Sequence, residues 1–520
     1  SSSPTKHEGE TKTMRIHTDI HGLTRMVSAA IAVVLVAVAP AAAQEADAPS
    51  APMGRGMAPE AAIAVLQSQD AGIKERQNAC RALSIRAGAE AVPVLAPMLL
   101  DPETSHMARI ALQRIPGPEA DAALRKALGK VSGHLAVGMM SSLTVRGDTQ
   151  AVPAIIALLA SDDVLVAQEA ARHLGRLGTR EAAKALQEAV PQGRVPEGGI
   201  SAFCDGLLGC AKRADDERAV AIYDQLLALD NAPRQVAPAA LRGAVLARGA
   251  KDGLPLLLDA LRGEDADQFG AALRAAMELD ANKKVSAALA EALPELAPDR
   301  QVQLLALLGQ LAGAAAGPAM LAEAEEGPEE VRVAALHAIA RTGYAPALAS
   351  IKEMACAEDG PVTQAARETL SYFPGKKGDA VLEDMLADNA SAVRRLAVEL
   401  VGKGGLPEPV GLLMDVAEDD ADEAVRVAAL EALNTYAGIE QMPRLLERVT
   451  TAASAAERKA AESALATLCT REKKAAPGQV TVQKAVYGAL PDGPKADVTG
   501  KVQALLDAGK LSVDASNGNL

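Results

Sequence analysis

Aromatic residues are nearly absent from this chain. It has no tryptophan, and aromatic residues make up 2% of its 520 positions, whereas 49% are hydrophobic. A core therefore has to be built from alanine, leucine, valine and isoleucine. Small side chains let helices approach closely, and alanine is the best helix former. The composition favours an all-helical fold.

Cysteine is also scarce, and its five positions do not form a disulfide framework. An odd number spread over the chain excludes a small disulfide-stapled fold. Cys204 and Cys210 are close enough in sequence for a local disulfide, which stays an alternative. Six residues along one helix turn through about 240°, so the two side chains would not face each other. We interpret both as buried small hydrophobes.

Recognisable catalytic and metal-binding patterns are missing as well. There is no C-x-x-C, no phosphate-binding G-x-x-x-x-G-K-[ST] loop and no G-x-S-x-G elbow. After residue 43 no two histidines have the spacing of a metal-binding pair. His106 and His134 occupy related positions and could approach each other, but no matching carboxylates or cysteines accompany them. We predict no metal, cofactor or catalytic residue, and partly exposed helical histidines at His106, His134, His173 and His337.

One acidic run suggests calcium at first sight. The EF-hand loop needs a central glycine and a glutamate at fixed distance, and neither is in place. Because the run directly precedes a helical segment, its charges are expected to form a solvated turn that favours a helix N-terminus. The run consists of Asp415, Glu418, Asp419, Asp420, Asp422 and Glu423.

Positive charge is in deficit over the chain. The formal net charge is −14 at pH 7. An acidic surface repels phosphate backbones, so we expect protein partners and no nucleic acid.

The first 59 residues have the organisation of a targeting segment. Residues 1–13 precede Met14 and are interpreted as read-through upstream of the start. A basic stretch, an apolar run over 27–39 and Ala41-Ala42-Ala43 then form a secretory signal peptide at 14–43. An uncleaved anchor is disfavoured because the run is shorter than the roughly 20 residues that span a bilayer. Residues 44–59, rich in Ala, Pro and Gly, are expected to be a flexible leader.

Glycine, in contrast, recurs with a period. Most neighbouring marker glycines lie 29 to 35 residues apart, and the wide interval from Gly178 to Gly249 has room for two units. Such a period indicates a solenoid, in which each helical pair buries its apolar face against the next pair. The markers are Gly88, Gly117, Gly147, Gly178, Gly249, Gly313, Gly343, Gly375, Gly405 and Gly438.

Each unit repeats the same local signals. Proline falls in the first turn of the first helix, where backbone N–H groups have no intrahelical partner. An Asp- or Asn-containing turn follows, and a second helix opens with Val-Arg. A glycine in left-handed conformation is expected to end it. The prolines are Pro93, Pro153, Pro255, Pro346 and Pro443, and the Val-Arg pairs stand at 331–332, 393–394 and 425–426.

These features resemble the HEAT-repeat family, including its shorter bacterial variants, the phycobilisome-lyase-type HEAT-like repeats. The resemblance covers Ala61 to Cys469 and is strongest from Gly313 to Gly438. It implies an all-α solenoid of about a dozen helix-turn-helix repeats over 60–469. It also implies that the repeated arginines form an internal ladder rather than a ligand site, namely Arg332, Arg394 and Arg426.

The last fifty residues differ in character. A linker is expected at 470–479. Residues 480–488 alternate like a strand, residues 502–506 are helical in pattern, and Leu511-Ser512-Val513 follows. The stretch 480–520 resembles the start of a small β-containing module of DnaJ-like proteins, cut short at Leu520.

Together these patterns predict an exported scaffold, periplasmic or extracellular, that mediates protein–protein interaction and is not an enzyme. The alternative is the non-catalytic solenoid part of a larger exported enzyme whose catalytic domain lies beyond Leu520. A role as a lyase or chaperone for a chromophore rests on the name of the repeat subtype alone.

Overall fold

The computed structural model describes residues 56–279, 283–311, 313–472, 480–483 and 511–514. Within them lie 26 α-helices, which alternate between a first and a second helix of each unit. The first helices are α2 (Pro59–Gln67), α4 (Val92–Met98), α6 (Pro118–Leu128), α8 (Val152–Ala157), α10 (Arg180–Ala189), α12 (Asp216–Leu227), α14 (Leu254–Arg262), α16 (Lys283–Glu291), α18 (Gly317–Glu326), α20 (Leu348–Ala355), α22 (Lys376–Leu386), α24 (Val410–Asp419) and α26 (Met442–Thr451).

The second helices carry the odd numbers. They are α3 (Ile73–Arg86), α5 (Ser105–Arg114), α7 (Gly133–Val145), α9 (Val164–Leu177), α11 (Ile200–Ala211), α13 (Val236–Asp252), α15 (Ala266–Glu278), α17 (Pro298–Leu311), α19 (Glu329–Thr342), α21 (Pro361–Ser371), α23 (Ser391–Leu400), α25 (Glu423–Tyr436) and α27 (Ala455–Glu472). Short 3₁₀ turns accompany them at 89–91, 149–151, 158–160, 293–295, 314–316, 345–347 and 439–441.

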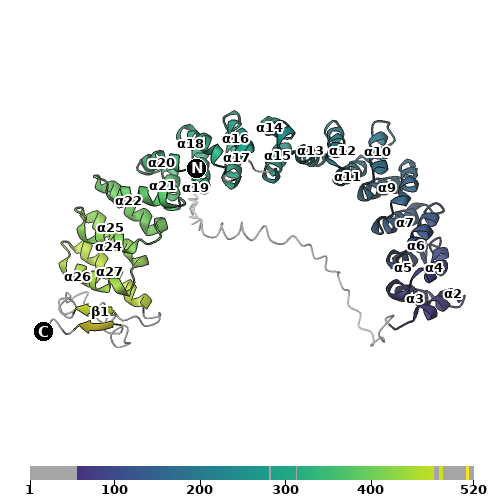
Figure 1. Cartoon of the computed structure of the whole chain (residues 1–520), viewed down its shortest axis with the longest axis horizontal. Helices are drawn as coiled ribbons and strands as arrows, with labels where there is room; N and C mark the ends of the chain where they lie inside the picture. The colour runs from purple at the N-terminus through teal and green to yellow at the C-terminus, as the bar shows by residue number, and fades with distance from the viewer. Residues whose placement is uncertain (1–55, 280–282, 312, 473–479, 484–510, 515–520) are drawn as a thin grey trace, which may run out of the picture. The chain divides into compact units, whose positions relative to one another are not determined.

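Each first helix packs on the second helix that follows it, and each second helix packs on the second helix of the next unit. The odd-numbered helices therefore lie side by side in chain order (Figure 1). This arrangement confirms the predicted all-α solenoid. Every unit contacts its sequence neighbours, so stability comes from adjacent interfaces rather than from one central core.

Local signals begin the helices as predicted. Pro93, Pro153, Pro255 and Pro443 occupy the first or second position of α4, α8, α14 and α26. Side-chain caps also occur at the second helices, because the carboxylate of Asp163 accepts hydrogen bonds from the backbone N–H groups of the first turn of α9.

Glycine ends only some of the second helices in the predicted way. Gly178 and Gly343 adopt the left-handed conformation directly after α9 and α19. At Gly88 and Gly438 the prediction is wrong, because α3 and α25 end one residue earlier, in the extended Ala87 and in Ala437. Each of these two glycines instead donates its N–H to the side chain of a following Glu or Gln.

The unit at Gly405 also departs from the expected ending. A π-helical segment, η7, occupies Val401–Gly405, and Gly404 rather than Gly405 has the positive φ, 109°. The interval from Gly249 to Gly313 holds two units, as does the one from Gly178 to Gly249. In the former, α15 ends in the extended Leu279, so no glycine marks the boundary.

The buried side chains form two clusters that meet at α13. Ala240 and Ala244 belong to the cluster that extends towards the N-terminus, and Leu241 and Val245 to the cluster that extends towards the C-terminus. Alanine and leucine dominate both clusters. The helix α13 is thus the point where the buried core changes from one cluster to the other.

Three glycines make a close approach between α9 and α11. A Cβ built on Gly175 of α9 would lie 2.5 Å from the carbonyl oxygen of Gly206 in α11, and a Cβ on Gly209 would lie 2.8 Å from the carbonyl oxygen of Gly175. Backbone meets backbone here, so neither partner can yield by rotating a side chain. The crossing requires glycine.

The C-terminal part contains two short strands. The strand β1 (Val480–Gln483) pairs in parallel with β2 (Leu511–Asp514), with Val480 opposite Leu511. The helix α27 continues to Glu472, three residues into the segment predicted as linker. Several predicted segments lie outside the described residues. They are the rest of that linker, residues 484–510 with the expected helix, the segments 1–13 and 14–43, and most of 44–59. The DnaJ-like module stays a prediction.

Among the described helices, none combines the length and apolar character needed to cross a bilayer.

Substitution of Gly206 by alanine tests the close crossing of α9 and α11. The new methyl would meet the carbonyl oxygen of Ala171 at 2.5 Å and Cδ1 of Leu186 at 3.0 Å. We expect Gly206→Ala to destabilise the chain by about 1–3 kcal/mol, because overpacking forces the helices apart. The midpoint of urea unfolding, followed by circular dichroism, measures this loss.

Gly411→Ala is the matched control. Gly411 lies in α24, is exposed, and has no atom within 4 Å of the added methyl. Alanine should stabilise this helix by about 0.5–1 kcal/mol, because glycine loses more backbone entropy on folding. A Gly206→Ala protein as stable as the parent would show that the crossing tolerates a side chain.

Candidate functional site

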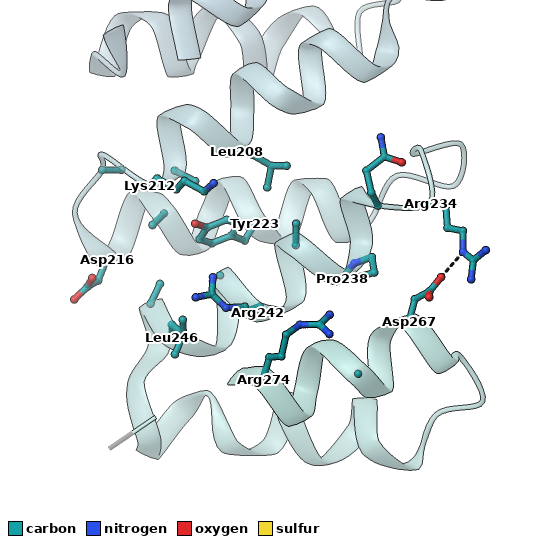
Figure 2. A pocket seen from close by; sticks show the side chains of 18 of the residues that line it. Leu208, Lys212, Asp216, Tyr223, Arg234, Pro238, Arg242, Leu246, Asp267 and Arg274 are labelled. Carbon is teal, nitrogen blue, oxygen red and sulfur yellow. Dashed lines mark hydrogen bonds and ion pairs between the residues drawn. The ribbon is translucent and has the colours of Figure 1, made fainter. Parts of the chain in front are cut away.

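An open groove lies where the core changes clusters. Its residues come from α11, α12, α13 and α15 and from the turn before α13, and its volume is about 920 Å³ (Figure 2). Polar and charged side chains line it together with alanine and glycine. The principal residues are Leu208, Lys212, Asp216, Tyr223, Arg234, Pro238, Arg242, Gly243, Leu246, Asp267, Gly270 and Arg274.

The floor of the groove is made by small residues and one aromatic ring. A Cβ on Gly243 would lie 2.2 Å from Cζ of Tyr223, so the missing side chain lets the ring lie against α13. Tyr223 is 6% exposed, and burial raises the pKa of its phenol. Its hydroxyl has no hydrogen-bond partner among the described residues and stays protonated at neutral pH. The remaining floor residues are Ala211, Ala214, Ala219, Ala239, Ala247, Ala266 and Gly270.

Four cationic side chains line the groove, against two carboxylates. Arg234 pairs with Asp267 at one end, and Asp216 lies at the other (Figure 2). Arg242 pairs with Glu278, which lies outside the lining; its Nε donates to Oε1 at 2.8 Å. Lys212 and Arg274 are exposed and have no ion-pair partner in the part of the chain that the structure describes.

The histidines are not gathered at this groove or elsewhere. His106 and His134 are exposed, and Nδ1 of His106 lies 3.2 Å from a guanidinium nitrogen of Arg109. His337 is half exposed beside Glu368. The prediction of partial exposure is wrong for His173, which is 2% exposed because α9 packs against both α7 and α11. Burial, and to a smaller extent Arg176, lower the pKa of His173 to about 4, so the ring is neutral at pH 7.

Cys204 and Cys210 both lie in α11 as free, buried thiols. Burial raises the pKa of Cys204 to about 11 and that of Cys210 to about 12. Thiols of this kind carry little thiolate at neutral pH and are poor nucleophiles. Neither contributes chemistry to the groove.

Two of the three arginines predicted as a ladder are connected. Arg394 of α23 holds both carboxylate oxygens of Asp420, at 2.7 and 2.8 Å. Arg426 of α25 donates to the backbone carbonyl of the same Asp420 at 2.7 Å and to the carboxylate of Glu457 at 3.1 Å. Glu457 is fully buried and also binds Arg448. This row of contacts joins α23, α25 and α27, which belong to three successive units.

Arg332 makes a different contact. Its Nε donates to the carbonyl oxygen of Ala324 at the end of α18, within its own unit. Arg394 and Arg426 likewise donate to carbonyl oxygens of the turn before their own helices. The three arginines therefore share one feature: each donates a hydrogen bond to a carbonyl oxygen at the end of the first helix of its unit or in the turn that follows this helix. That they also form one continuous ladder stays a prediction.

The acidic run contributes ion pairs as well as a helix cap. Asp422 caps α25 by accepting from the N–H of Ala424, as expected for a turn before a helix. Asp415 and Glu418, in contrast, both bind Arg444 of the next unit. No group of three or more His, Cys, Asp or Glu within the described ranges has the geometry to hold a metal ion.

The groove residues were missed by reasoning from sequence, although a signal was present. Lys212, Arg242 and Arg274 stand 30 and 32 residues apart, which is one repeat in each case. Cations at the period of the repeat, on successive second helices, mark one face of the array. Tyr223 could not be found in this way, because its place depends on the backbone opposite it at Gly243.

Asp420→Asn tests the contact with Arg394. The hydrogen bonds from Arg394 hold the pKa of the Asp420 carboxyl below its ordinary value. The carboxylate therefore stabilises the fold above the unfolded pKa near 4, and the stabilisation is lost as pH falls through the lower folded value. We expect the substitution to cost about 1–3 kcal/mol at pH 7, with the difference shrinking towards about pH 3.

Urea unfolding at both pH values measures the difference, and Asp419→Asn is its control. Asp419 is the exposed neighbour, with no ion pair among the described residues, and its substitution removes the same charge. Equal losses from the two substitutions, or a loss at Asp420 that does not change with pH, would contradict a role for the carboxylate.

A family model described as HEAT repeats matches residues 380–466. No curated protein matches the chain. Among solved structures, human deoxyhypusine hydroxylase in complex with glycerol is 20% identical, over 55% of this chain and 96% of that one, with a TM-score of 0.22. Kap95p, in a structure on its binding to RanGDP, is 12% identical, over 87% and 73%, with a TM-score of 0.42.

The complex of CpcE and CpcF of phycocyanin lyase from Nostoc sp. PCC7120 is 21% identical, over 52% of this chain and 99% of that one, with a TM-score of 0.24. At such identities and TM-scores, these likenesses carry no statement about activity or partners. The family match covers α23, α24, α25 and α26, together with most of α22 and of α27, and the same alternation of helices continues from there to α2. The matched segment, residues 380–466, therefore consists of HEAT repeats.

Proposed function

We propose that the chain is an exported scaffold that binds a protein partner through the groove of α11, α12, α13 and α15. The observation that carries the proposal is the groove itself. It leaves polar and charged side chains of several successive helices facing one open space of about 920 Å³. A surface of this kind offers many contacts to an extended partner and no convergent catalytic group.

The low aromatic content affects the kind of binding. Tyr223 is the one aromatic residue among those that line the groove, whereas tight interfaces concentrate their energy in Trp, Tyr and Arg. Arg234, Arg242 and Arg274 supply the remaining anchoring side chains. Recognition would therefore rely on arginine and on contacts spread along the groove rather than on one deep apolar anchor.

Export is the second part of the proposal. It is supported by the basic stretch, the apolar run at 27–39 and the Ala41-Ala42-Ala43 site. A periplasmic or extracellular location follows if the segment is removed after Ala43.

A fusion of residues 14–43 to a β-lactamase lacking its own signal tests export. We expect ampicillin resistance in a Gram-negative host and a product cleaved directly after Ala43. Leu35→Arg should abolish the resistance, because a charge in the apolar run prevents membrane targeting. Resistance that persists with Leu35→Arg, or a fusion that stays inside the cell, would remove the support for export.

Site-specific photo-crosslinking tests the groove as the binding surface. A photoreactive residue replaces Gln235, which lines the groove, or Lys184 of α10, whose side chain is 77% exposed away from it. In the native host, we expect position 235 to join one partner protein and position 184 to give none. Equal cross-linking from both positions, or none from 235 and from its neighbour Ala239, would contradict the proposal.

A further inference from the structure

The cations of the groove recur with the repeat. Lys212 directly follows the last residue of α11, and Arg242 and Arg274 lie on α13 and α15. Figure 2 shows the three around one open space. They form a row that crosses successive units, so a partner lying along the array meets a cation in each unit.

The balance of charge in the groove is opposite to that of the chain. Four cations and two carboxylates line it, in a protein with a net charge of −14, and one of the cations, Arg242, is paired with Glu278 outside the lining. The carboxylates lie at its ends, where Asp267 is occupied by Arg234 (Figure 2). An anionic partner is attracted to this region and repelled by the net negative charge of the chain, which favours binding at the groove.

The polar groups without partners in the groove are mostly hydrogen-bond donors. Lys212, Arg274 and the hydroxyl of Tyr223 have no partner among the described residues, and burial raises the pKa of Tyr223, which keeps its proton in place. Carboxylates accept hydrogen bonds and donate none when ionised. Between the cations, the alanine and glycine floor leaves room for a peptide backbone and for methylene groups.

From these observations we propose that the groove binds an extended peptide segment rich in Asp or Glu. The inference rests on the proposed function and specifies its partner. Neighbouring helices pack about 8–10 Å apart, so the groove extends about 20 Å from α11 to α15. An extended chain rises about 3.3 Å per residue, so about six residues fill it. Single-stranded nucleic acid fits less well, because it uses several stacking aromatic rings and this groove offers Tyr223 alone.

Fluorescence anisotropy with the full chain tests the proposal. The probe is a fluorescein-labelled 12-residue peptide of alternating glutamate and alanine. We expect binding that weakens with added salt, and a dissociation constant about fivefold to tenfold higher for the Lys212→Ala/Arg274→Ala double variant. Tyr223→Phe, which keeps the ring and removes the donor, should weaken binding by about twofold to fivefold.

The control variant is Lys376→Ala/Lys377→Ala. Both lysines are exposed at the start of α22, outside the groove, and the double variant loses the same charge. It should bind the peptide within about twofold of the parent, the expected size of a change in long-range charge alone. Circular dichroism and the thermal midpoint establish that every variant is folded.

Three results would overturn the acidic-segment proposal. The two double variants could lose affinity equally, a matched lysine–alanine peptide could bind as well as the glutamate peptide, or a 12-nucleotide single-stranded DNA could displace the peptide at lower concentration. If position 235 cross-links a partner whose binding depends on neither Lys212 nor Arg274, the scaffold stands and the acidic segment is wrong. If the peptide binds but no partner cross-links, the proposed function fails on its own.

Discussion

Burial of alanine- and leucine-rich faces between neighbouring units is the constraint on which the rest of the structure depends. No unit has enough aromatic side chains to build a core of its own, so each helical pair buries its apolar face against the next pair. Small residues also decide how close the helices come. At Gly175 and Gly206 they allow backbone-to-backbone contact, and at Gly243 the missing side chain admits the ring of Tyr223. The same composition thus produces a tight crossing and, one unit later, a groove.

Polar contacts complete what apolar packing leaves open. Each turn between two helices exposes carbonyl oxygens that need donors, and Arg332, Arg394 and Arg426 supply them from the helix that follows. In the last units these arginines also bind Asp420 and Glu457. The buried Glu457 keeps its charge there: burial raises the pKa of its carboxyl, but the bonds from Arg426 and Arg448 outweigh this and hold it below its ordinary value. The charge network therefore connects α23, α25 and α27 of three successive units.

The sequence was sufficient for the architecture and insufficient for the site, for a physical reason. The glycine period, the first-turn proline and the capping aspartate are signals within one unit. They therefore predict helical pairs without knowledge of the units that pack against them. The predicted ends of α3 and α25 are wrong. A helix can end in a left-handed glycine or in a non-helical residue before the glycine, and the outcome depends on the side chain that accepts the N–H of Gly88 or Gly438. The burial of His173 and the place of Tyr223 depend on helices one or two units away. Among the groove residues, only the cations spaced at the repeat period could have been identified from the sequence alone.

Charge along the row of second helices differs between the middle of the array and its C-terminal units. Cations outnumber carboxylates in the groove of α11, α13 and α15. A second hollow, of about 600 Å³ at α23, α25 and α27, is lined by four carboxylates and one arginine, namely Glu399, Asp422, Glu423, Glu431 and Arg395. Because unlike charges attract and like charges repel over roughly one Debye length, about 8–10 Å, the two regions act independently. The proposed acidic segment would be attracted to the first region and repelled by the second. Apolar stacking alone is uniform along a repeat array, so it is this difference in charge that distinguishes the two regions of the surface.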